Sequence, residues 1–279
     1  MQKPLIISAA VTGGSRPKQR GPQQPVLPAE IVAEAIACWH AGAAIAHIHA
    51  RDDSGETTSD PARHVAIRDA IRAGGCDIIV NFSAGDDGGK ADHETRLAIV
   101  RDGGGEMASL SCGSFNVGRR LYDNRPEFLQ RSALIMRDFG VRPEVEVIDT
   151  GNMYLVDSFV REGLIPRPSL VQFGFGLPGG MPARTALLDQ LVESLPPGLE
   201  WGVICQSPRH EDYLRMAMAA FTRGGHVRTG IEDIAMVNTS DTAANNAELV
   251  HQWAQTARIW GRPVASPGVA RQMLGFGGR

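Results

Sequence analysis

Residues 43–52 read AAIAHIHARD, an apolar run that ends in two histidines, an arginine and an aspartate. The part 43–50 has the length and composition of a buried β-strand. Side chains two residues apart on a strand point to the same face, so His47 and His49 project side by side near its end. Burying two unpaired imidazoles is costly, which marks this strand end as a candidate metal site.

On either side of this strand, short β-rich runs alternate with helix-like segments. The expected strands span 5–10, 43–50, 77–82, 106–110, 144–148, 169–173, 199–204 and 226–230. The expected helices span 28–40, 60–74, 91–101, 126–139, 153–161, 183–195, 211–222 and, last, 242–260. Eight such units predict one (β/α)8 TIM barrel domain over 1–279, closed by a C-terminal helix. A doubly wound α/β sheet is the alternative, although no G-x-G-x-x-G turn follows the first strand.

Composition narrows the class of protein. The 279 residues carry a net charge of −3 with no basic patch or tail, so nucleic acid is not an expected partner. No apolar stretch approaches the roughly 20 residues that span a bilayer, so no membrane partner is expected. The four cysteines lie far apart without C-x-x-C spacing, which favours free thiols and a cytoplasmic location.

A metal ion would satisfy both imidazoles at once, whereas two hydrogen-bonded core histidines are the structural alternative. A catalytic zinc site takes three protein ligands and leaves one position open. The third ligand should come from another strand end, where Glu232 follows the last strand and Glu146 lies on the fifth. Spacing alone does not choose between them.

Other polar residues gather at the expected strand ends, where a barrel places its active site. Arg228 lies five residues before Asp233, a spacing that suits an oriented base or a structural ion pair. Ser83 and Gly85 close the third strand, and Ser109 and Ser111 share one face of the fourth. Each of these groups is a candidate for holding a substrate carboxylate, or a generic polar loop.

With these segments in view, the sequence resembles the β-keto acid cleavage enzyme family, typified by 3-keto-5-aminohexanoate cleavage enzyme. The resemblance rests on segments spread almost from end to end of the chain. These are AVTG at 10–13, HIHARD at 47–52, EMASL at 106–110, RPEVE at 142–146, GGHVRTGIED at 224–233, NAELV at 246–250 and GRPVASP at 261–267. The block around Arg228 and Asp233, at its distance from the paired histidines, makes the resemblance specific.

The resemblance implies a barrel that assembles as a homotetramer and binds one Zn²⁺ per chain. It assigns the zinc ligands to His47, His49 and Glu232. It assigns the catalytic base and its arginine to Asp233 and Arg228. A strand-five glutamate falls on Glu144 or Glu146, and substrate contacts fall on Ser83 and on Ser109 or Ser111. Gly85 and Ser15, near the ends of the third and first strands, are further candidate substrate contacts. The implied reaction condenses a β-keto acid with acetyl-CoA and releases acetoacetate and a new acyl-CoA.

One departure from the family bears on the substrate. Members that act on an amino-bearing keto acid carry a glutamate shortly after the first T-G, but the present chain reads Gly14-Ser15-Arg16 there. A cationic substrate would lose its partner, so the resemblance predicts a neutral or anionic keto acid. Arg16 either faces a second carboxylate or is solvated.

The competing function is a zinc-dependent barrel hydrolase or aldolase that does not use CoA. An amidohydrolase-like version fits less well, because such enzymes carry H-x-H on the first strand and this chain carries it on the second.

Overall fold

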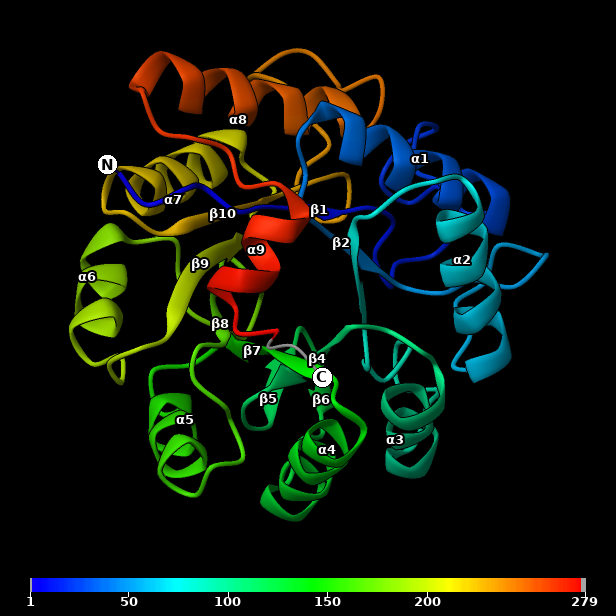
Figure 1. Ribbon diagram of the computed structural model, residues 1–279, viewed down its shortest axis with the longest axis vertical. Coiled ribbons are helices and arrows are strands. Elements are labelled where there is room, and N and C mark those ends of the chain that lie inside the picture. The colour runs from blue at the N-terminus through cyan, green and yellow to red at the C-terminus, as the bar shows by residue number, and fades with distance from the viewer. Residues whose placement is uncertain (1, 277–279) are drawn as a thin grey trace.

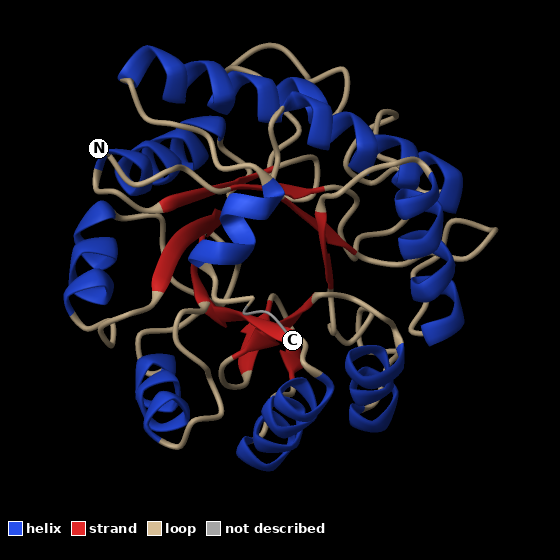
Figure 2. Ribbon diagram, in the orientation of Figure 1, coloured by secondary structure: helices blue, strands red, loops and turns tan. Residues whose placement is uncertain are grey.

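The computed structural model describes residues 2–276, and at its centre eight parallel strands close into a barrel (Figure 2). In barrel order each strand pairs with its sequence neighbour, and β1 closes the ring against β10. The strands are β1 (Ile7–Ala10), β2 (Ile45–Ile48), β3 (Ile79–Phe82), β4 (Met107–Ser111), β7 (Arg142–Val147), β8 (Leu170–Phe175), β9 (Glu200–Cys205) and β10 (His226–Thr229). The predicted TIM barrel is confirmed.

Helices surround the barrel, one after most strands (Figure 1). Their bounds are α1 (Pro28–Ala41), α2 (Pro61–Ala73), α3 (His93–Asp102), α4 (Pro126–Phe139), α5 (Asn152–Arg161), α6 (Thr185–Glu193), α7 (His210–Thr222), α8 (Asn246–Trp260) and α9 (Pro267–Met273). The sequence signals act locally as expected. Asp60 accepts a hydrogen bond from the Ala62 amide and caps α2, and Gly140 ends α4 in the left-handed region at φ 70°.

Two parts of the chain differ from the prediction. The helix expected over 242–260 begins only at Asn246, because the Asn245 side chain accepts from the Glu248 amide and caps it there. It is also not the C-terminal helix, since α9 follows. A two-stranded hairpin, β5 (Phe115–Val117) and β6 (Arg120–Tyr122), lies outside the barrel sheet and was not predicted. Among residues 2–276, no helix is both long and apolar enough to cross a bilayer.

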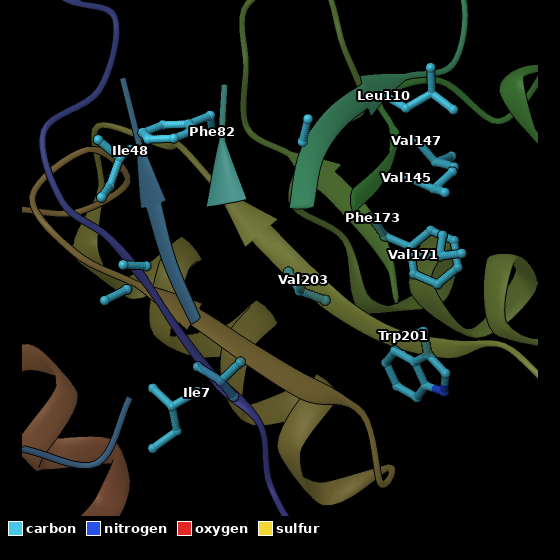
Figure 3. Close-up of a cluster of buried hydrophobic side chains, with 14 of the residues drawn as sticks. Ile7, Ile48, Phe82, Leu110, Val145, Val147, Val171, Phe173, Trp201 and Val203 are labelled. Atoms are coloured by element: carbon cyan, nitrogen blue, oxygen red, sulfur yellow. The ribbon is translucent and has the colours of Figure 1, made fainter. Parts of the chain in front are cut away.

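The main hydrophobic core lies between the barrel and the helices. It takes the outward-facing residues of each strand, which alternate with inward-facing ones. Figure 3 shows part of it, with Ile48, Phe82, Leu110, Val145, Val147, Val171, Phe173, Trp201 and Val203. All of them are less than 10% exposed, so this layer fixes the strands in register. The side chains inside the barrel are therefore available to form a functional site.

Inside the barrel, the side chains change from apolar to polar along the strands. A separate apolar cluster fills the amino end and packs against α9, which crosses that end of the barrel in Figure 1. Its members include Ile6, Ile45, Ile79, Met107, Leu170, Ala270 and Leu274. Two residues further along the strands the interior is polar, with His47, Asn81, Glu144, Gln172 and Arg228 all buried. The amino end is therefore sealed, and the functional groups face the carboxyl end.

One polar contact also lies near the sealed end. The Ile6 amide donates to Nδ1 of His226, and Nε2 of His226 lies 3.0 Å from Glu200 Oε2. Because Nδ1 accepts, Nε2 carries the proton of a neutral ring. Burial lowers the pKa of His226, against the pull of Glu200. Burial would raise the pKa of Glu200, but hydrogen bonds from His226 and Lys3 lower it to about 2.

Candidate active site

A cavity of about 300 Å³ opens at the carboxyl ends of the strands. Its walls come from loops after β1, β3, β8 and β10, from inward-facing strand residues, and from the hairpin. Ten of the twelve predicted site residues line it: Ser15, His47, His49, Ser83, Gly85, Ser109, Ser111, Glu146, Arg228 and Glu232. Glu144 and Asp233 are buried directly behind this wall.

His47, His49 and Glu232 meet at one point of the cavity. The two imidazoles come from β2 and the residue just after it, with ring centroids 5.4 Å apart. Glu232 reaches them from beyond β10, where its amide donates to the Ala10 carbonyl. Gly230 makes this approach possible, because at φ 137° a Cβ would lie 2.2 Å from the Ala10 carbonyl oxygen. Donor atoms of the three residues lie within 4.8 Å of one another.

The donor set fits a metal ion. Nε2 of His47 lies 3.8 Å from Glu232 Oε2, and Nε2 of His49 lies 3.6 Å from Glu232 Oε1. Donors that share a tetrahedral zinc at about 2.1 Å are themselves about 3.4 Å apart. Glu232 Oε2 is buried without a hydrogen-bond partner, an arrangement that is costly unless a cation satisfies it. Two histidines and one carboxylate are also a common ligand set of catalytic zinc.

Glu144 lies behind His47 and orients it. The other ring nitrogen, Nδ1, is 2.9 Å from Glu144 Oε2, so the ring donates there and keeps Nε2 free for the cavity. Asn81 and Gln172 donate to the same carboxylate at 2.6 and 3.3 Å. Burial would raise the pKa of Glu144, but His47 and Arg228 outweigh it and lower the pKa to about 2. Glu144 is therefore a carboxylate that holds a ring in place.

The other strand-five glutamate, Glu146, is the one that lines the cavity. It lies on the same face of β7, and Ser111 Oγ donates to it at 2.5 Å. Burial raises its pKa, and the neighbouring Glu144 carboxylate adds to the rise. The pKa of Glu144 is thus lowered and the pKa of Glu146 is raised. A protonated Glu146 can donate a hydrogen bond to a substrate oxygen.

Arg228 and Asp233 form a buried pair beside the metal ligands. Arg228 donates from Nε to Asp233 Oδ2 at 2.9 Å and from Nη2 to Glu232 Oε1 at 2.6 Å. Its Nη1 is buried without a hydrogen-bond partner. Burial raises the pKa of Asp233 in spite of Arg228. Asp233 thus meets the cavity only through Arg228 and Gln206, which donates to Asp233 Oδ1 at 2.9 Å.

The predicted small and hydroxyl-bearing residues all line the cavity. Ser83 Oγ accepts from the Gly85 amide, and Ser109 Oγ accepts from the Ala84 amide, so both hydroxyl protons remain free to be donated. Ser15 Oγ accepts from Gln24. The structure thus brings the hydroxyls that the sequence assigned to substrate contact into one cavity.

Sequence reasoning missed the outer wall. The hairpin contributes Phe115, Val117 and Tyr122 to the cavity, and the loop after β8 contributes Leu177. These two segments touch, because the Gly118 amide donates to the Pro178 carbonyl. The alternating apolar residues around the two-residue turn at Gly118 were a recognisable hairpin signal. Gln206 carried no such signal, since its role depends on contacts made only in the folded chain.

Comparison with known proteins shows the family to which the chain belongs. A sequence profile described as beta-keto acid cleavage enzyme matches residues 4–276. The chain is 34% identical over 275 residues to 3-keto-5-aminohexanoate cleavage enzyme of Fusobacterium nucleatum subsp. nucleatum, covering 98% of each. It is 32% identical over 279 residues to 3-oxoadipate:acetyl-CoA acetyltransferase of Cupriavidus necator, covering 99% of this chain and 96% of the relative.

Among solved structures, ObcA in complex with a C4-CoA adduct and oxalate is similar in fold, with a TM-score of 0.78 and 22% identity. The match covers 91% of this chain and 68% of ObcA. At this level of identity the likeness concerns the barrel alone.

Proposed function

The chain belongs to the beta-keto acid cleavage enzyme family, and we propose that it condenses a β-keto acid with acetyl-CoA to form acetoacetate and a new acyl-CoA. The observation that carries the proposal is the position of Arg228 and Asp233 directly against the cluster of His47, His49 and Glu232, in one cavity. Among the relatives, one is named for a cleavage of a β-keto acid and another for an acetyl transfer from acetyl-CoA.

We propose zinc, one ion per chain, as the metal that His47, His49 and Glu232 hold. Bound there, zinc would supply a Lewis acid that polarises the ketone of the keto acid. Glu144 fixes the ring of His47 for this task, and Arg228 fixes the carboxylate of Glu232. The chain thus holds each of two ligands through a second, buried charged group.

The proposed chemistry begins with removal of a proton from the carbon between the ketone and the carboxylate. Asp233 is the proposed base, because its carboxyl is buried, paired with Arg228 and raised in pKa. It does not line the cavity, so the proton would reach it by way of Arg228, which does. Nη1 of Arg228 makes no hydrogen bond and lies 3.8 Å from Glu144 Oε2 and 3.9 Å from Glu146 Oε1. It is the proposed donor to a substrate oxygen as negative charge builds up.

The carbanion then attacks the thioester carbonyl of acetyl-CoA, a carbon–carbon bond forms, and CoA leaves as a thiolate. The thiolate adds to the original ketone, and the bond between that carbon and the former carbanion carbon breaks. The departing fragment takes a proton and is acetoacetate, while the rest of the keto acid remains on CoA. Hydroxyls of Ser83 and Ser109 and the carboxyl of Glu146 are the proposed contacts that hold the substrate carboxylate.

The keto acid is proposed to be non-cationic. Gly14 lines the cavity beside His49, where a Cβ would lie 3.1 Å from the imidazole ring, and neither Gly14 nor Ser15 offers an acid. An ammonium group on the substrate would therefore lack a carboxylate on this edge. The homotetramer that the family resemblance implies is also proposed, and light scattering on the purified protein tests it. The cytoplasmic location that the scattered cysteines favour is proposed as well.

A screen of β-keto acids with acetyl-CoA, read by mass for new acyl-CoA, tests the function. We expect an acyl-CoA two carbons shorter than the keto acid, and no product after removal of the metal by chelation. In a His47→Ala, His49→Ala double variant, zinc and turnover should disappear together. Stoichiometric zinc in that variant, or a broad panel that yields no acyl-CoA with the wild type, would contradict the proposal and favour a barrel enzyme that works without CoA.

A further inference from the structure

Besides the groups already described, four charged side chains line the cavity, and one of these four has no side-chain partner. Arg120 pairs with Asp86, so these two charges cancel. Asp87 also lines the cavity, and its carboxylate accepts a hydrogen bond from Ser59. Arg20 also lines the cavity, and within residues 2–276 its guanidinium makes no hydrogen bond or ion pair. It is half-buried, so this free positive charge is presented to whatever occupies the cavity.

The loop that carries Arg20 is held firmly from beneath. Gln24 is fully buried and donates to the Thr12 carbonyl at 2.6 Å and to Ser15 Oγ at 2.9 Å, while its Oε1 accepts from the Arg20 amide. Arg51 is also fully buried and donates to the Gly13 and Ser15 carbonyls, each at 2.7 Å. The backbone under Arg20 is therefore fixed before any substrate arrives, which lowers the entropic cost of using its side chain.

Of the two arginines compared in this loop, Arg16 and Arg20, only Arg20 lines the cavity. Arg16, which the sequence offered as a partner for a second carboxylate, is exposed and does not line the cavity. Gly14, Ser15 and Arg20 line it along one edge, the edge on which amino-selective relatives are expected to carry an acid. Here that edge presents a guanidinium instead, so its charge preference is reversed.

Resting on the proposed function, we propose that Arg20 binds a second carboxylate at the far end of the substrate, so that the β-keto acid is a dicarboxylate. Its reacting end lies at the metal ligands, and its aliphatic chain runs along the apolar wall formed by Phe115, Val117 and Leu177. A guanidinium binds a carboxylate through two parallel hydrogen bonds, which gives both affinity and selection against an uncharged end.

Two substrates that differ only at the far end test this. We would compare 3-oxoadipate with its methyl-terminated analogue of the same chain length, each with acetyl-CoA. The wild type should prefer the dicarboxylate, and Arg20→Gln should lower kcat/KM for it by roughly 5- to 30-fold while leaving the analogue within about twofold. Arg20→Lys should give a kcat/KM between those of the wild type and Arg20→Gln, because lysine keeps the positive charge but cannot form the two parallel hydrogen bonds. Arg16→Gln is the matched control and should change neither substrate.

Three outcomes would overturn the proposal. A wild-type preference for the methyl-terminated acid, or an Arg20→Gln variant with unchanged selectivity, leaves Arg20 as a solvated charge. A rise confined to KM for acetyl-CoA, equal with both acids, places Arg20 against the phosphates of CoA instead. If the wild type makes acyl-CoA from neither of these acids nor from any acid of the broad panel, the proposed function fails. Calorimetric binding of the two acids to wild type and Arg20→Gln then still decides the role of Arg20.

Discussion

Replacing Glu144 by glutamine should weaken metal binding although Glu144 is not itself a ligand. The three groups around its carboxylate, His47 Nδ1, Asn81 Nδ2 and Gln172 Nε2, are donors in the arrangement that leaves His47 Nε2 free. A glutamine offers one acceptor and one donor. Either the Gln172 amide turns its unpartnered Oε1 toward that donor, or one of the three N–H groups faces another N–H. If that one is His47, the ring loses its anchor. Loss of such a partner typically costs 10- to 100-fold in metal affinity, or about 1.4–2.7 kcal/mol.

The assay is competition for zinc between the protein and a chromophoric chelator. Glu94→Gln, the same chemical change at an exposed carboxylate on α3, is the control and should bind zinc as the wild type does. Thermal unfolding of the metal-free proteins shows whether the barrel itself has suffered. A zinc Kd of Glu144→Gln within about threefold of the wild type, with the fold intact, would refute the inference that this carboxylate orients His47.

Three other changes probe separate parts of the structure. Asp233→Asn should keep stoichiometric zinc but lower kcat by roughly a hundredfold or more, because the base is lost and the ligands are not; unchanged kcat removes Asp233 from that role. Leu274→Ala should lower the free energy of unfolding by about 2–4 kcal/mol, measured in urea, without changing zinc affinity, since Leu274 is 1% exposed in the cluster that seals the far end of the barrel. The stability that His226 and Glu200 contribute to the metal-free protein should be lost as the pH falls below about 6.5, and further below about 4.5. The pKa values of both groups are lower in the folded state than in the unfolded chain, which therefore takes up protons first. His226→Asn, which cannot titrate, should lose less between pH 7 and 5.5, and an equal loss would contradict the assignment.

The order of the barrel was predictable because its signals are local. Each strand is a short apolar run, and proline, glycine and cap residues such as Asp60 and Gly140 mark where helices begin and end. Period-two spacing was enough to place His47 and His49 on one face. The late start of α8 depends on whether Asn245 or an earlier residue caps it, a choice that propensity alone does not make.

The roles of other residues depend on contacts between distant parts of the chain. The spacing of Glu144 and Glu146 could not show which of them lines the cavity, since both point into the barrel. They differ in depth along the barrel axis, and only Glu146 reaches the cavity. Arg51 stood in a conspicuous motif, yet its buried guanidinium braces the loop after β1. Arg20 and Gln206 had no pattern at all, because loop geometry brings them to the cavity.

The fate of the acetyl group tests the central claim most directly. The enzyme is given a β-keto acid and acetyl-CoA that carries ¹³C in both acetyl carbons, and the products are analysed by mass. The proposed reaction places both labelled carbons in acetoacetate and leaves the new acyl-CoA unlabelled. Labelled acetate or labelled acetyl-CoA returned intact, beside an unlabelled cleavage product, would contradict a condensation between the two substrates.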